Sequence, residues 1–238
     1  MINFINLIMK NTILVLSLLF FCNSISAQLN LSTFYSKINA TDWQTQIDSK
    51  LGNQNNLNYN QAFTFGLSYW FRLPQKRVEF TPEISYADFE GEYVFPNDGQ
   101  FNVDIHLHQF NFHTNIYILD FAGDCNCPTF GKQEPIFKKG LFLQVSPGVM
   151  FSSYNVNEGD VSNATSFQIG AGIGLDIGLS ENFTITPTFR AKQHFNVNWL
   201  NLDQYLIEGN ENFEDHDNLS NILQFEAGLQ FGIRWKKY

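Results

Sequence analysis

The chain has 238 residues and a formal net charge of −9, and 16% of its residues are charged while 16% are aromatic, including 25 phenylalanines. Such an acidic chain is not expected to bind nucleic acid, because the phosphates would repel it. Beyond residue 27 no stretch is apolar enough to cross a membrane as a helix, so the apolar residues must be dispersed at some shorter period.

The first 27 residues have the pattern of an export signal. Lys10 precedes an apolar run from Ile13 to Cys22, and small polar residues lead to Ala27. The run is too short for a membrane anchor, so we expect a signal peptide over residues 1–27, with Met9 as an alternative start, and a mature domain over residues 28–238. Lipidation at Cys22 is disfavoured, because the bulky Phe21 precedes it.

Apolar and polar residues alternate in four segments of the first half of the chain. Three of them, Leu29–Tyr35, Phe63–Phe71 and Val78–Tyr86, each predict a strand with one apolar face. The fourth, Val103–Ile118, changes parity halfway, and this change predicts a β-bulge near Gln109.

The connection that follows, residues 120–139, contains Cys125 and Cys127, the only cysteines of the expected mature domain. An oxidising periplasm favours a disulfide between them, but a bridge across one intervening residue is strained and readily reduced. A stapled turn or a stable thiol pair is the simpler interpretation. The alternative is a redox role or the docking of a periplasmic or envelope protein by residues 120–139.

The second half of the chain alternates more regularly. It predicts four further strands, Leu141–Phe151, Phe167–Leu179, Phe183–Phe195 and Leu223–Trp235. These segments exceed the usual five to six residues of a globular strand, and their polar faces are rich in Gly, Ser, Thr and Gln. Such faces suit the lumen of a barrel whose apolar face meets lipid.

We therefore predict an all-β fold, an eight-stranded antiparallel up-and-down transmembrane β-barrel in the cell outer membrane, in contact with outer-membrane lipid. Residues 39–58, 93–102, 156–165 and 197–219 would then be outer loops, and residues 73–77, 120–139 and 180–182 inner connections. A soluble periplasmic ligand-binding barrel is the alternative fold, and it would place the apolar residues inside.

Charged residues on the polar faces must find partners in a narrow lumen. We expect an ion-pair network there. Its members would be Arg72, Glu79, Glu83, Arg190, Lys192, Glu226 and Arg234. Paired carboxylates can also act as acid and base, but mixed charges in a filled lumen need no such role.

No motif points to catalysis, a cofactor or a metal. His106 and His108 share a strand face, with His113 beyond the expected bulge, but no third ligand is fixed by spacing. The acidic segment Glu208–Asp217 lacks the spacing of a calcium loop and is expected to be a solvated loop. A lipid-modifying barrel enzyme remains an alternative, because its Ser, His and acidic residue would come from separate strands.

Three features together resemble the PorT-like outer-membrane β-barrel family of Bacteroidetes. They are the signal ending in Ser26-Ala27-Gln28, the aromatic-rich alternation of apolar and polar residues, and the Gly-punctuated strand Phe167–Leu179. The stretch Asp124-Cys-Asn-Cys-Pro-Thr-Phe130 is similar to that of a flavobacterial subset of such barrels. The resemblance implies an outer-membrane location and no shared catalytic residues, and one member of the family serves type IX secretion. The function we expect is a non-enzymatic structural or accessory role in the envelope, related to secretion or adhesion.

Overall fold

The computed structural model describes residues 28–41, 61–73, 77–95, 99–119, 140–156, 162–180, 182–198 and 219–234. Nearly all of them lie in β-strands. In chain order the strands are β1 (Gln28–Asn39), β2 (Gln61–Arg72), β3 (Val78–Phe95), β4 (Gly99–Ile116), β5 (Leu141–Val156), β6 (Ser162–Leu175), β7 (Ile177–Gly178), β8 (Phe183–Asn198) and β9 (Leu219–Arg234).

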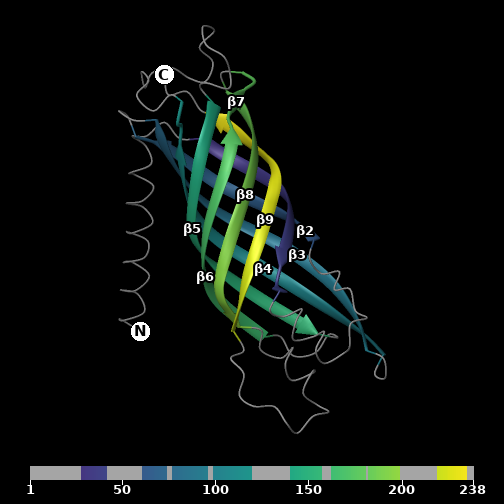
Figure 1. Ribbon diagram of the computed structural model, residues 1–238. Coiled ribbons are helices and arrows are strands. Elements are labelled where there is room, and N and C mark those ends of the chain that lie inside the picture. The colour runs from purple at the N-terminus through teal and green to yellow at the C-terminus, as the bar shows by residue number, and fades with distance from the viewer. Residues whose placement is uncertain are drawn as a thin grey trace, which may run out of the picture.

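The strands form one closed antiparallel barrel (Figure 1). Each long strand pairs with its sequence neighbour, β1 pairs with β9, and the pairing of β6 with β8 closes the wall. The two-residue β7 continues β6 along the same partner, β8, in an unchanged register. The wall therefore has eight strands, as the alternation predicts.

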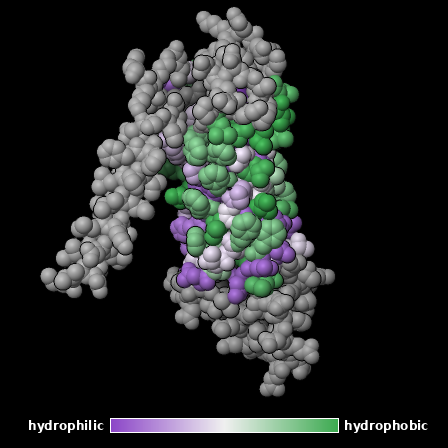
Figure 2. Space-filling view, turned by 90° about the vertical axis from the view of Figure 1, so that its left-hand side faces the viewer, coloured by the Kyte–Doolittle hydropathy of each residue, from purple (hydrophilic) through white to green (hydrophobic). Residues whose placement is uncertain are grey.

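The outer surface of the barrel is apolar over most of its height. Large apolar side chains point outward with a third to two thirds of their surface exposed, among them Phe65, Ile84, Phe151, Phe167 and Phe189. On β5 the outward apolar residues run from Leu141 to Phe151, and at a tilt of about 40° this length gives a belt of about 25 Å, the height of a membrane hydrocarbon core. In Figure 2 apolar residues cover the middle and upper part of the visible face, and hydrophilic residues gather towards its lower end.

The side chains that point inward are mostly polar over the same height, with serines, threonines, glutamines and charged residues buried there beside a few apolar residues such as Phe34 and Phe142. An apolar exterior around a polar interior is the reverse of a soluble barrel, and it is stable only in lipid. The protein is therefore an outer-membrane barrel, and the soluble alternative is not supported. No helix in the described ranges is long and apolar enough to span a membrane.

The polarity reverses beyond the belt, at the end where β3 and β4 meet. There the inward residues are apolar and buried, and we call them the rim core: Ile38, Ala62, Ala87, Phe89, Ile105, Leu107, Tyr154, Val197 and Ile222. The outward residues at this end are mostly polar, for example Lys37, Asp88 and His108. The wall thus leaves the membrane and continues as a water-exposed barrel, which packs as a soluble protein does.

This reversal corrects the bulge predicted near Gln109. The register between β3 and β4 is continuous from Val78↔Ile116 to Phe95↔Gly99, without a shift. Ile105 and Leu107 point inward into the rim core, whereas Phe110 and Phe112 point outward to lipid. The change of parity in the sequence marks the membrane boundary, not an extra residue.

The wall is irregular elsewhere. The register between β8 and β9 shifts between His194 and Val197, and Asn196 there has a φ of 51°, a left-handed conformation that Asn tolerates better than most residues. The outer loop expected over residues 93–102 is also shorter than predicted. β3 continues to Phe95 and β4 begins at Gly99, so the two strands form a hairpin that extends the wall outward (Figure 1).

Candidate functional site

Ionisable side chains from four strands meet in the centre of the lumen. Glu83 comes from β3, His113 from β4, Arg190 and Lys192 from β8, and Glu226 from β9, and each is at most 1% exposed. We call these five residues the lumen network. Alternation of side chains along each strand directs them inward, and the closure of the barrel brings β3 and β4 within reach of β8 and β9 across the lumen.

The lumen network is a chain of charge-assisted contacts. Arg190 contacts both carboxylates, with Nη1 3.1 Å from Oε1 of Glu83 and Nε 2.9 Å from Oε2 of Glu226. Lys192 donates from Nζ to Oε1 of Glu226 at 2.8 Å. Two carboxylates thus face two cations, which is the balance that buried charges require.

Uncharged groups complete the contacts around Lys192 and Glu226. Gln109 on β4 accepts from Nζ of Lys192 at 2.7 Å and donates to Gln224 at 2.9 Å. Gln224 in turn donates to Glu226 at 2.9 Å and lies 2.8 Å from Nε2 of His194. These residues join β4, β8 and β9 across the lumen, so the polar side chains around Lys192 and Glu226 form one hydrogen-bonded cluster.

Phe34 on β1 packs against Arg190 of the lumen network. Its ring lies under the guanidinium of Arg190, with Cζ 3.9 Å from the ring centroid, and the ring is 1% exposed. This cation–π contact gives the cation an apolar neighbour that still favours its charge.

Glycines make room for the long side chains. A Cβ at Gly172 would lie 3.0 Å from Cγ of Arg190, and a Cβ at Gly170 would lie 3.0 Å from Cγ of Lys192. Both glycines stand on β6 directly opposite these residues of β8. The Gly-rich polar face seen in the sequence is therefore the surface over which the cations lie.

Glu79 lies apart from the lumen network, although the sequence groups them. It accepts hydrogen bonds from the indole of Trp70 and from the hydroxyl of Tyr117, the latter at 2.7 Å. Arg77 stacks on the same Tyr117, with Cζ 4.4 Å from the ring centroid. These groups form a second polar cluster, which lies near the periplasmic end because β3 begins there at Val78.

Ser146, His113 and Glu83 form an arrangement similar to a catalytic triad. Ser146 Oγ lies 2.7 Å from Nδ1 of His113, and Nε2 of His113 lies 3.1 Å from Glu83 Oε1. Serine, imidazole and carboxylate in such contact can activate a nucleophile. However, Ser146 is 1% exposed, so a substrate has no path to its hydroxyl in this conformation.

Arg190 also sets the wrong tautomer for that chemistry. Its Nη1 lies 2.8 Å from Nε2 of His113, and because a guanidinium only donates, Nε2 must accept. The proton of His113 is then on Nδ1 and is donated to Ser146, whose own proton reaches Oε1 of Gln144 at 3.4 Å. In this state the imidazole is not a base for Ser146, and the contact is a structural hydrogen bond.

The other histidines named from the sequence do not join His113. His106 and His108 point outward above the belt, where Nδ1 of His106 lies 2.8 Å from Oδ1 of Asp88 and the ring of Tyr86 packs against both imidazoles. The continuous register of β4 explains the separation, since His113 has the opposite parity. Within the described ranges no three His, Cys, Asp or Glu residues gather as a metal site.

Several predicted features lie outside the described residues. They are the signal segment 1–27, the connection 120–139 with Cys125 and Cys127, and the acidic segment Glu208–Asp217. For Arg72 and Arg234 only the backbone is described, at the last residues of β2 and β9.

No protein-family model and no curated protein matches this sequence. Solved structures with a similar course of the chain include Neisserial surface protein A, with 11% identity over 88% of this chain and 97% of that chain and a TM-score of 0.48. Ail, the attachment invasion locus protein of Yersinia pestis, has 10% identity over 87% and 97% and a TM-score of 0.42. The outer-membrane protease OmpT of Escherichia coli has 9% identity over 88% and 96% and a TM-score of 0.40. At these values the likenesses assign no residue and no activity.

Proposed function

We propose that this chain is a non-enzymatic outer-membrane barrel with a structural or accessory role in the cell envelope. The observation that carries the proposal is that the barrel is filled at two levels. The lumen network occupies the membrane layer, and the rim core occupies the layer above it.

The filled membrane layer argues against transport. Eight strands enclose a lumen that side chains can fill, and here the largest buried side chains include Arg190, Lys192 and Phe142. Moving a solute past them would separate buried ion pairs, each of which costs several kcal/mol to break.

The apolar packing of the rim core supports a role in which the barrel contacts molecules outside the cell. The rim core gives the water-exposed part of the wall an apolar interior, so this part keeps its shape above the membrane. A rigid wall of this kind fixes the outer ends of the strands above the membrane, which suits an adhesive or accessory contact with molecules outside the cell.

Conductance tests the closed state directly. The purified barrel is incorporated into planar lipid bilayers, with an open porin incorporated in parallel to control for insertion. We expect no stepwise conductance above the bilayer background. Reproducible single-channel openings that scale with the amount of protein would overturn the proposal.

A second part of the proposal concerns the periplasmic side. The connection 120–139 with Cys125 and Cys127 is the most distinctive sequence feature at that side, and we propose that it docks an envelope protein. A crosslinked pull-down from outer membranes compares the wild type with the Cys125→Ser/Cys127→Ser variant and with a Ser180→Ala variant in another inner turn. A partner lost only from the cysteine variant supports this docking, and identical partner sets contradict it.

We propose membership of the PorT-like family and a role related to secretion or to adhesion, and deletion of the gene distinguishes the two. A role in secretion is tested first. Deletion of the gene should then reduce the amount of secreted protein in the medium, and restoration of the gene should correct it. Unchanged secretion with reduced attachment to surfaces would favour adhesion instead.

A lipid acyl hydrolase is the second candidate, because Ser146, His113 and Glu83 converge. A fluorophosphonate probe distinguishes the two, since it labels an activated serine irrespective of the natural substrate. We expect no labelling of the wild type in detergent or in vesicles. Labelling that disappears in Ser146→Ala but persists in Ser152→Ala, a buried serine of the same strand, would establish the hydrolase.

A further inference from the structure

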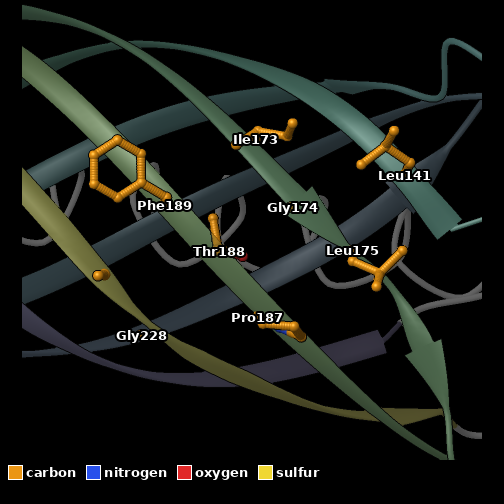
Figure 3. Close-up of a pocket in the computed structure, with 9 residues that line it drawn as sticks. Leu141, Ile173, Gly174, Leu175, Pro187, Thr188, Phe189 and Gly228 are labelled. Atoms are coloured by element: carbon orange, nitrogen blue, oxygen red, sulfur yellow. The ribbon is translucent and has the colours of Figure 1, made fainter. Parts of the chain in front are cut away.

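A hollow lies on the lipid-facing surface of the barrel where β5, β6, β8 and β9 run side by side (Figure 3). Its volume is about 400 Å³, within the usual range of ligand sites. Its walls are Leu141, Ile173, Leu175, Pro187, Phe189 and Ala227.

The hollow exists because β6 and β8 separate at this point. Their pairing ends at Gly174↔Thr188 and resumes at Ile177↔Ile185, and this register sets Leu175 opposite Pro187. Proline has no N–H and cannot contribute a donor to the ladder.

At the gap, the end of β6 stays paired with β5. The N–H of Asp176 donates to the carbonyl of Gly140 at 2.9 Å, which continues the pairing of Leu175 with Leu141. The strand therefore follows β5 and leaves β8, and a hydrogen bond from Thr186 Oγ1 to Oδ1 of Asp176, at 3.2 Å, spans the gap.

Small residues deepen the hollow. Gly174, Gly228 and Thr188 form its floor, and Ala227 is the smallest of the outward-facing wall residues. The hydroxyl of Thr188 is already used, because it donates to the carbonyl of Thr186 at 3.2 Å and accepts from Nε2 of Gln230 at 3.2 Å. The lining side chains thus offer no unused polar atom, and an aliphatic occupant matches them.

The depth of the hollow identifies the kind of molecule that can reach it. Leu141, the first residue of β5 at its periplasmic end, and its partner Leu175 on β6 line the hollow, so the hollow opens at the periplasmic edge of the apolar belt. The surroundings there are the acyl chains of the periplasmic leaflet. An inserted protein segment is disfavoured, because its backbone would need polar partners that the walls lack.

We propose that this hollow retains one acyl chain of a periplasmic-leaflet phospholipid, seated over the gap at Pro187 and in contact with Ile173 and Phe189. The chain fills the depression that the interrupted ladder leaves, and the lipid stays with the barrel when surrounding lipid exchanges.

Native mass spectrometry of the barrel released gently from phosphatidylethanolamine vesicles tests the proposal. The wild type should carry one retained phospholipid. Ala227→Phe places a ring in the hollow and should lower that occupancy at least tenfold, whereas Ala171→Phe makes the same change on the lipid face outside the hollow and should leave it unchanged. Equal occupancy in both variants, or none in the wild type, overturns the proposal.

A second measurement uses only the wild type, in case Ala227→Phe does not fold. Phosphatidylethanolamine with a diazirine on one acyl chain is crosslinked to the barrel in vesicles, and the labelled residues are mapped. Labelling of Phe189 and Ile173 should exceed that of Ile84, the fourth outward residue from the periplasmic start of β3, by several fold. Uniform labelling of the three positions shows ordinary surrounding lipid and contradicts a retained chain.

Discussion

Glu83→Gln removes one of the two negative charges of the lumen network. Glu83 accepts from Arg190 and lies against His113, both at 3.1 Å, and it accepts from Ser32 at 3.2 Å. At an effective dielectric constant of about 20, a pair of unit charges at this distance attracts by roughly 5 kcal/mol. The neutral amide leaves Arg190 and Lys192 to share Glu226 alone, and breaking a buried pair in this way costs about 3–5 kcal/mol.

The assay is equilibrium unfolding in urea in lipid vesicles, followed by tryptophan fluorescence. Glu90→Gln is the matched control, because Glu90 lies on the same strand but is exposed on the outer face above the belt, and it should change the free energy of unfolding by less than about 0.5 kcal/mol. Glu83→Leu combined with Arg190→Met replaces the whole pair and should recover at least half of the loss, with a coupling energy of about 1–3 kcal/mol. The reasoning would be refuted if Glu83→Gln lowered the free energy of unfolding no more than Glu90→Gln does. It would also be refuted if the loss in the double variant equalled the sum of the losses of Glu83→Leu and Arg190→Met alone.

Three further predictions concern other parts of the wall. Gly172→Ala should lower the free energy of unfolding by about 1–3 kcal/mol, because the new Cβ would lie 2.8 Å from the backbone oxygen of Phe189 and 3.0 Å from Cγ of Arg190. The lipid-facing Ala171→Val should be tolerated in the same unfolding assay. Phe89→Ala should lower the free energy of unfolding by about 3–5 kcal/mol, because Phe89 is fully buried in the rim core. It should also open the outer end of the barrel to protease added to whole cells, whereas the lipid-facing Phe110→Ala should leave protease resistance intact. Asn196→Val should lower the free energy of unfolding by about 1–2 kcal/mol and Asn196→Gly should hardly change it, because the φ of 51° disfavours a branched side chain. Equal losses of stability in the two variants would contradict a left-handed bulge.

The sequence predicts the strands well because the period of two is a local property. Each residue of β9 from Leu223 to Ile233 alternates as expected, and so does β6. The inward position of Glu83, Arg190, Lys192 and Glu226 also follows from parity alone.

The partners of these residues do not follow from parity. Gln109, Gln224 and Ser146 are ordinary polar residues in the sequence, and they meet the charges only through the register between strands and the closure of the barrel. His113 is visible as a histidine in the sequence, but the bulge expected near Gln109 was wrong, and the continuous parity of β4 sets His113 on the opposite face from His106. A membrane boundary and a β-bulge produce the same change in the apolar pattern, and the sequence contains no signal that separates them.

A spin-label scan of β5 tests most directly whether the barrel wall has an apolar face towards lipid and a polar face towards the lumen. With Cys125 and Cys127 replaced by serine, single cysteines at positions 143–146 and 148–151 carry a nitroxide, and its collisions with oxygen and with a water-soluble nickel complex are measured in vesicles. Leu143, Val145, Val149 and Phe151 should show high oxygen and low nickel accessibility, and the alternate positions should be shielded from both. Nickel accessibility at the four outward positions would contradict an outer-membrane barrel.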